Sequence, residues 1–110
     1  ARMIVRLVKM TFRPEETERF QALFESWRHR IIAFPGCRSL ELLHDIRRNG
    51  VFFTRSEWNS PEDLEAYRNS AVFADVWPVV KPLFAEPAQA WSTASEHRMS
   101  ATTPESPTPA

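Results

Sequence analysis

The chain contains 110 residues, of which 43% are apolar and 12% are aromatic. This composition is typical of a single packed domain and not of a disordered chain. Its 14 Lys and Arg residues equal its 14 Asp and Glu residues in number. Because no net charge attracts polyanions, we expect neither nucleic acid nor a membrane as a partner.

The expected cellular location rests on three features. Cys37 is the single cysteine, so the chain cannot form an internal disulfide, which fits a reducing compartment. No apolar run approaches the roughly 20 residues needed to cross a bilayer. Residues 1–12 show neither the apolar segment nor the cleavage site of a secretory signal. We therefore expect a cytoplasmic protein.

The first predicted elements are a strand and a helix. Residues 3–12 are apolar and β-branched on both faces, interrupted by Arg6 and Lys9, which is typical of a central strand. Pro14 then opens a helix, and residues 34–36, Phe-Pro-Gly, end it. Its apolar residues fall on one stripe: Phe20, Leu23, Phe24, Trp27 and Ile31.

A hairpin is predicted next. Residues 38–46 suit a strand, with His44 on the same face as Leu40 and Leu42. Residues 48–50, Arg-Asn-Gly, predict a tight turn, because Asn-Gly accepts the positive φ values that such turns require. Residues 51–59 form the returning strand.

A second helical segment and a last strand complete the domain. Ser60, Pro61 and Asp63 have the spacing of an N-cap, a proline at the first helical position and a capping-box acid. An apolar series of helical period then continues to Phe84, and Pro78 predicts a kink or a restart near Trp77. The following residues predict the last strand over 87–95 and a disordered tail over 97–110.

The order of elements predicts the fold class. Strand, helix, two strands, helix and strand is the β-α-β-β-α-β order of the ferredoxin-like split βαβ fold, an α+β fold with an antiparallel sheet. We expect one domain over residues 1–96. Helices cover one face of such a sheet, yet the strands are apolar on both faces, so the other face needs a cover. The simplest cover is a second copy, which predicts a homodimer through the sheet face.

Several kinds of site are excluded by what is missing. Gly36 and Gly50 are the only glycines, so the chain has no glycine-rich phosphate or dinucleotide loop. His29, His44 and His97 lack paired metal-ligand spacing. We therefore expect no cofactor and no metal.

The sequence resembles the antibiotic biosynthesis monooxygenase family over about residues 3–95. The matching segments are LELLHDI, FFTRSEWNSPEDLEAYRNSAVF, KPLF and AWS. The most specific part is the tryptophan that ends the third strand, followed by the capped helix with the pattern L-x-x-Y-R-x-S. The resemblance implies a small dimeric α+β barrel with a pocket between sheet and helices.

The resemblance also implies roles for two tryptophans. Trp58 corresponds to a tryptophan in the pocket wall. In haem-degrading members a histidine on the second helix ligates iron, and by spacing Trp77 occupies that position, which disfavours haem degradation here. Other members oxygenate polycyclic phenols or quinols. We expect Trp58 and Trp77 to contact an aromatic ligand.

Each remaining candidate has two interpretations. Tyr67 either orients a ligand or is a core residue with a hydrogen-bonded hydroxyl, and Trp58 is either pocket wall or core. His44 either acts as a base near neutral pH or is merely hydrogen-bonded. Arg6 either stabilises an anion in a cavity or forms an ion pair with Glu57 or Glu41 across the sheet or the dimer seam.

The resulting hypothesis is a cofactor-independent monooxygenase that acts on an aromatic phenol or quinol. His44 is the expected base, Arg6 stabilises the anion, and three rings bind the substrate: Trp58, Tyr67 and Trp77. The alternative is a dimeric barrel without catalytic activity that binds a small metabolite or acts as a stress-linked accessory module.

Overall fold

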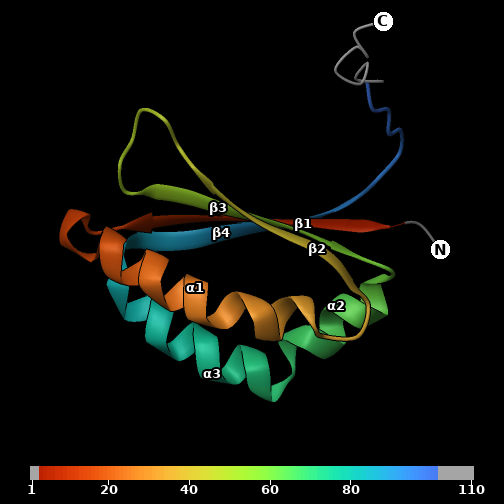
Figure 1. The fold of residues 1–110 in the computed structure, drawn as a ribbon, viewed down its shortest axis with the longest axis horizontal. Helices are drawn as coiled ribbons and strands as arrows, with labels where there is room; N and C mark the ends of the chain where they lie inside the picture. Colours follow the sequence, from red (N-terminus) through yellow and green to blue (C-terminus); the bar gives the residue numbers. More distant parts are fainter. Residues whose placement is uncertain (1–2, 102–110) are drawn as a thin grey trace, which may run out of the picture.

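The computed structural model describes residues 3–101 and has the predicted α+β fold (Figure 1). In this range the strands are β1 (Ile4–Phe12), β2 (Cys37–His44), β3 (Val51–Trp58) and β4 (Phe84–Ala94). The helices are α1 (Thr17–Ile32), α2 (Pro61–Arg68) and α3 (Ala71–Val80). Short 3₁₀ turns, Pro14–Glu16 and Lys81–Leu83, precede α1 and β4.

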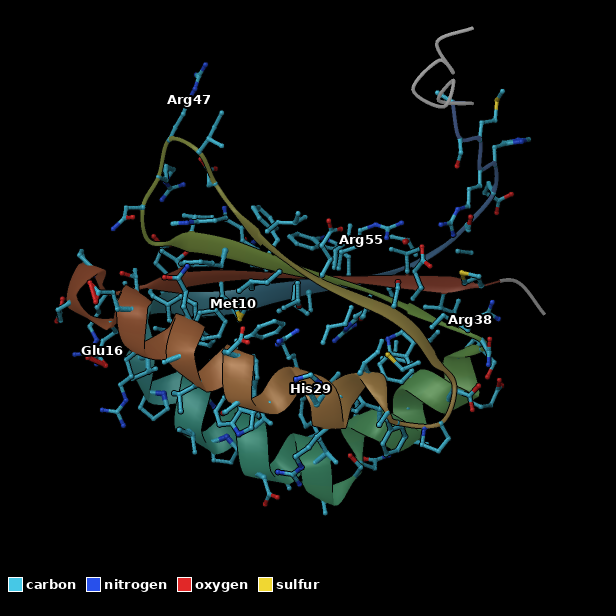
Figure 2. All side chains as sticks on the ribbon, viewed as in Figure 1. Met10, Glu16, His29, Arg38, Arg47 and Arg55 are labelled. Atoms are coloured by element: carbon cyan, nitrogen blue, oxygen red, sulfur yellow. The ribbon has the colours of Figure 1, made fainter. Side chains whose placement is uncertain are left out.

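The sheet is antiparallel in the order β2-β3-β1-β4, so β1 is a central strand as predicted. All three helices lie on one side of it (Figure 1). Because side chains alternate along a strand, neighbouring residues of β1 face opposite ways. Figure 2 shows this alternation across the sheet, with Met10 between sheet and helices and Arg55 on the uncovered face.

The core occupies one end of the space between sheet and helices. Its buried members are Met10, Phe12, Phe20, Phe52, Val80 and Leu83. The rings of Phe12 and Phe20 stack at 4.2 Å between centroids, and Phe52 meets both rings edge-on. Fully burying such side chains contributes roughly 1.5–3 kcal/mol each, so this aromatic cluster fixes α1 onto β1 and β3.

The connection between β2 and β3 differs from the predicted tight turn. It spans residues 45–50, and Gly50 does not adopt a positive φ. Instead, the Asp45 carboxylate accepts hydrogen bonds from the backbone N–H groups of Arg47 and Arg48 at 2.7 and 3.0 Å. A side chain at Gly50 would meet the carbonyl oxygen of Phe12. Glycine is therefore needed at position 50 because the backbone of Phe12 passes close by, and not because the turn requires a positive φ.

The interruption of the second helical segment also lies elsewhere than predicted. Helix α3 continues through Pro78 to Val80, and the chain breaks between α2 and α3 at Ser70. The Ser70 hydroxyl accepts a hydrogen bond from the N–H of Phe73 and starts the new helix. Strand β4 begins at Phe84, earlier than the predicted residue 87.

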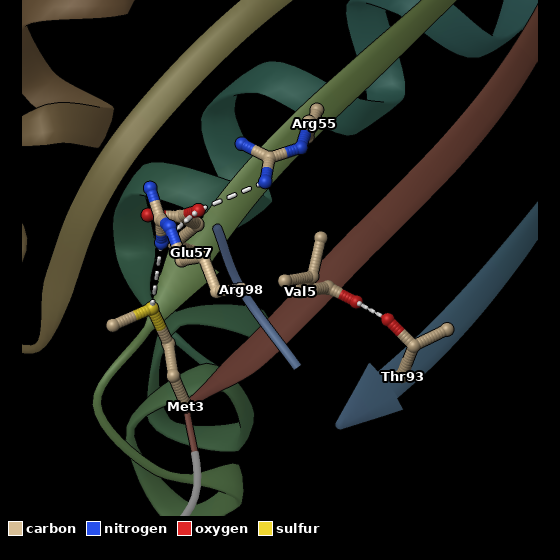
Figure 3. A network of polar contacts seen from close by, with 6 residues as sticks. All are labelled: Met3, Val5, Arg55, Glu57, Thr93 and Arg98. Atoms are coloured by element: carbon tan, nitrogen blue, oxygen red, sulfur yellow. Dashed lines mark hydrogen bonds and ion pairs between the residues drawn. The ribbon is translucent and has the colours of Figure 1, made fainter. Parts of the chain in front are cut away.

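The segment after β4 contacts the uncovered face. Residues 97–101 have no regular secondary structure, while 102–110 of the predicted tail lie outside the described residues. The guanidinium of Arg98 lies 3.0 Å from Glu57, which Arg55 also approaches at 2.9 Å (Figure 3). Burial alone would raise the pKa of Glu57, but Arg55, the side chain of Ser39 and Arg98 together hold it below its ordinary value. No helix within residues 3–101 is long and apolar enough to cross a bilayer.

The two serine caps should each contribute measurably to the free energy of unfolding. The Ser60 hydroxyl accepts from the N–H of Asp63 as predicted, and Ser70 caps α3 in the same way. Replacing either serine by alanine should lower the free energy of unfolding in urea by about 1 kcal/mol. Ser26, whose hydroxyl bonds to the carbonyl of Leu23 within α1, is the matched control. Ser26→Ala should change stability by less than about 0.5 kcal/mol; equal losses in all three variants would contradict the capping roles.

Candidate functional site

A cavity of about 350 Å³ lies between the sheet and the helices, next to the aromatic core. The sheet contributes these lining residues: Arg6, Val8, Met10, Leu40, Thr54, Ser56, Trp58, Ala88 and Ala90. The helices contribute these: Phe20, Phe24, Trp27, Ile31, Leu64, Tyr67, Arg68, Phe73, Val76, Trp77 and Val80. A pocket of this size and apolar character is typical of a small-molecule site.

The hollow is caused by small residues on the edge strand. On β1, Val8 faces the cavity, and its neighbour on β4 is Ala90. Ala88 and Ala90 project no further than one methyl group, so this part of β4 leaves space between the sheet and the helices. Ala90 is exposed although it lines the cavity, which places the mouth at this edge of the sheet.

The three predicted aromatic residues lie together along the cavity. Trp58, at the end of β3, stacks on Tyr67 of α2 with 5.0 Å between ring centroids. Tyr67 meets Phe73 edge-on at 5.4 Å, and Phe73 stacks on Trp77 at 5.8 Å. Phe73 thus joins the predicted residues into one continuous ring wall. Aromatic neighbours in stacked and edge-on arrangements stabilise one another beyond the area they bury.

Trp58 has the features of both earlier interpretations. It is 1% exposed, like a core residue, and it also lines the cavity. Its indole N–H donates to the Ser56 hydroxyl at 2.9 Å. Because the donor is satisfied inside the protein, the Trp58 ring is held in one orientation and offers a ligand an apolar surface.

Tyr67 presents a neutral hydroxyl. Burial, and to a lesser extent the neighbouring Cys37, raise the pKa of Tyr67 to about 12. Within residues 3–101 this hydroxyl has no hydrogen-bond partner, although the ring is held on both sides. It is therefore available as a donor to a ligand, and it cannot serve as a base near neutral pH.

Arg6 lies on the cavity side of β1. Its guanidinium donates to the Ser92 hydroxyl of β4 at 2.8 Å. No carboxylate among the described residues is in ion-pair contact with it. Glu57, an expected ion-pair partner, lies on the opposite face and contacts Arg55 and Arg98 instead. Burial, followed by the positive charge of Arg68, lowers the pKa of Arg6, while Glu65 acts in the opposite sense.

Arg68 also lines the cavity, which the sequence analysis did not predict. A signal was present, because Leu64, Tyr67 and Arg68 are spaced by three and four residues and so share one helical face. Phe24 and Trp27, which belong to the apolar stripe of α1, also line the cavity. The helical spacing of these residues does not show whether a side chain packs on the sheet or faces a cavity.

His44 is the one predicted site residue that the fold does not bring to the cavity. It ends β2, stacks on Phe52 at 4.0 Å and approaches the carbonyl oxygen of Asn49 with Nε2 at 2.7 Å. Its placement matches the simple hydrogen-bonded interpretation. Of the described residues that line the cavity, none is histidine, aspartate or glutamate. No group of three or more potential metal-binding side chains occurs within residues 3–101.

The raised pKa of Tyr67 can be measured directly, because it is the only tyrosine in the chain. A folded pKa of about 12 against an ordinary value of 10.0 means that ionisation favours unfolding. This contribution to stability is complete below pH 10 and is lost as the pH rises towards 12. At pH 11, absorbance at about 295 nm should show roughly a tenth of Tyr67 ionised in the folded protein and roughly nine tenths in urea. Circular dichroism confirms folding at that pH, and a folded-state midpoint near 10 would contradict the assignment.

Comparison with known proteins places the chain in a family. The structure superposes on a conserved protein of Methanosarcina mazei Go1 with a TM-score of 0.82 and 16% identity, covering 86% of this chain and 94% of the other. For Rv0793 of Mycobacterium tuberculosis the TM-score is 0.81 and the identity 20%, with 89% and 99% covered. At these identities the likeness concerns the fold. No curated protein sequence matches significantly. The family model described as antibiotic biosynthesis monooxygenase matches residues 3–77, and the chain belongs to this family.

Proposed function

We propose that the protein binds an electron-rich aromatic molecule, a phenol or a quinol, in this cavity and oxygenates it without a cofactor. The observation that carries the proposal is an open apolar cavity on which polar groups converge, in a chain of the monooxygenase family. If the rings of Trp58, Tyr67 and Trp77 filled the space between sheet and helices, the non-catalytic alternative would be favoured. They line a hollow of about 350 Å³ instead.

The proposed reaction is balanced by the substrate and O₂ alone. In an anthrone, a CH₂ group between two aromatic rings becomes a carbonyl. One oxygen atom of O₂ enters that carbonyl and the other leaves as water with the two hydrogens. The substrate supplies all four electrons. The protein therefore needs to bind the substrate, favour its deprotonated form and exclude bulk water.

The cavity residues suit these tasks in different ways. The wall formed by Trp58, Tyr67, Phe73 and Trp77 offers a planar substrate stacking surfaces. Arg6 and the Tyr67 hydroxyl offer hydrogen bonds to the oxygen on which negative charge develops. A partly dry environment strengthens such interactions. The deprotonated substrate, an enolate with its negative charge on oxygen, is therefore favoured over the neutral substrate. The proton then passes to solvent through the mouth at Ala90, without His44.

The second candidate is a binding protein without catalytic activity. It is favoured by one observation, the lack of histidine, aspartate and glutamate among the described lining residues. General acid–base catalysis usually relies on such groups. Under this alternative the same rings hold the same class of molecule, and O₂ is not consumed.

Oxygen uptake distinguishes the two candidates. The wild-type protein should consume O₂ above the buffer rate when mixed with an anthrone or a quinol. Ala88→Phe, which places a ring inside the hollow, should reduce uptake at least about 10-fold, since misplacing the reacting groups is costly. Ala22→Phe adds the same bulk to an exposed position of α1 and should leave uptake unchanged. No uptake with any electron-rich phenol would remove the catalytic proposal and leave the binding one.

We also propose that the uncovered face of the sheet pairs with a second copy of the chain. This face holds the exposed side chains of Leu43 and Trp91, 39% and 46% accessible, and the half-buried Phe53. The 45–50 loop and the segment after β4 rise on this side at opposite ends of the sheet (Figure 1). A second sheet laid between them would remove the apolar side chains from water.

Analytical ultracentrifugation tests this pairing. The wild-type chain should sediment as a dimer at micromolar concentration. Phe53→Lys puts a second positive charge directly opposite Lys9 of β1 in the proposed contact. It should weaken dimerisation by at least about 100-fold, because charges removed from water without an opposite partner are strongly unfavourable. Gln21→Lys adds the same charge to the exposed side of α1 and should have no effect. A wild-type monomer at micromolar concentration would contradict the proposal.

A further inference from the structure

The polar groups that face the cavity share one property, which is that they can all donate hydrogen bonds. They are Arg6, Arg68, Thr54, Ser56 and Tyr67. The Ser56 oxygen already accepts from the indole of Trp58, so its own proton remains for another partner. Tyr67 keeps its proton far above neutral pH. Of the described lining residues none carries a carboxylate to receive these donors.

Two of these groups carry positive charge and come from opposite sides of the cavity. Arg6 belongs to β1 in the sheet, and Arg68 ends α2. Glu65 lies one turn before Arg68 on the exposed side of α2, with 3.8 Å between carboxylate and guanidinium. When Glu65 is counted, one positive charge is still in excess at this end of the cavity. The side chain of Arg68 is 45% exposed, and its charge still acts on Arg6. Like charges on opposite walls of one cavity repel each other, and an anion between them removes the repulsion.

We propose that the natural ligand is an aromatic molecule with a negatively charged group, a carboxylate or an ionised phenol, held by Arg6 and Arg68. Guanidinium groups recognise planar oxyanions through paired N–H donors. The ring of the ligand lies against the Trp58 and Tyr67 wall, and its charged group points to the mouth beside Ala90. This inference rests on the proposed function and specifies the class of molecule that the site takes.

An anionic ligand also explains why none of the described lining residues is a histidine, aspartate or glutamate that could act as a base. A ligand that enters already ionised at its acidic group, or ionises because two guanidinium groups stabilise the anion, requires no proton acceptor in the cavity wall. The five donors then have an acceptor of the right charge. A neutral aromatic ligand would leave Arg6 with the Ser92 hydroxyl as its only acceptor among the described residues.

Isothermal titration calorimetry with two matched probes tests the inference. 2-Naphthoate carries a carboxylate, and 2-naphthamide has nearly the same shape without the charge. Wild-type protein should bind 2-naphthoate at least about 10-fold more tightly. Arg6→Gln and Arg68→Gln should each weaken 2-naphthoate about 10-fold and change 2-naphthamide by less than about 3-fold. Arg6→Lys, which keeps the charge and loses the paired donors, should fall between wild type and Arg6→Gln.

Arg38→Gln is the control, because Arg38 is exposed and bonds to Asn59 outside the cavity. It should bind both probes as the wild type does. Circular dichroism confirms that the arginine variants are folded. Equal affinity for the two probes, or equal losses for both in Arg6→Gln, would overturn the inference while leaving an aromatic-binding cavity and the proposed function in place. Failure of both probes to bind would overturn the cavity as a ligand site and the proposed function with it.

A third probe separates the two sources of negative charge. 4-Nitrophenol becomes yellow when it ionises. If wild-type protein produces the yellow form at a pH where the free compound is colourless, and Arg6→Gln does not, the site stabilises an ionised phenol. If it binds only as the colourless phenol while 2-naphthoate binds tightly, the charged group is a carboxylate. Colourless binding together with equal affinity for the two naphthalene probes counts against an anionic ligand of either kind.

Discussion

The alternation of side chains along β1 links the core to the cavity. Phe12 and Met10 are 1% and 4% exposed and must face the helices, because no other apolar layer is available to them. With a period of two, Val8 and Arg6 then face the same side. A slip of one residue in the register would expose the two core side chains and turn Arg6 to the uncovered face at once. The position of the guanidinium in the cavity is therefore fixed by the burial of residues at the far end of the same strand.

This constraint has an energetic consequence for the site. A guanidinium that is partly removed from water loses hydration, and its hydroxyl partner Ser92 replaces only part of that loss. The open mouth beside Ala90 keeps the loss moderate. Arg6 stays charged in this environment, whereas Tyr67 stays neutral, because burial raises the pKa of its hydroxyl. The cavity thus contains a cation and neutral donors, an arrangement that is better suited to holding negative charge than to accepting protons.

Much of the fold and part of the site could be predicted from sequence. The run of apolar residues on both faces of β1 and the Ser60 cap are local signals, and they predicted the central strand and the capped helix that the structure shows. The 45–50 loop could not be predicted in the same way, because an Asn-Gly pair indicates a tight turn whereas the Asp45 side chain and the approach of Phe12 to Gly50 decide the actual path. For Trp58 and Tyr67 the sequence left pocket wall and core open, because an aromatic residue on the covered side has the same pattern in both cases, and the structure places both residues and Trp77 along the cavity. Arg68 was missed, because a residue at the end of a helix has the same pattern whether it faces solvent or a hollow.

Because side chains alternate along each strand, the residues between the cavity-facing ones point to the uncovered face. This face is not uniformly apolar. Opposite the cavity, Phe53 and Leu43 lie beside Arg55 and Glu57, and Glu57 is only 5% exposed because Arg55 and Arg98 cover it. A buried carboxylate with two guanidinium partners contributes stability only while it is ionised, so protonation as the pH falls through its lowered pKa would release Arg98 and the segment after β4. That segment borders the proposed contact with a second copy. The apolar side chains Leu43, Phe53 and Trp91 and the satisfied ion cluster on this face suit the proposed pairing, because apolar contacts supply affinity and charged groups fix orientation.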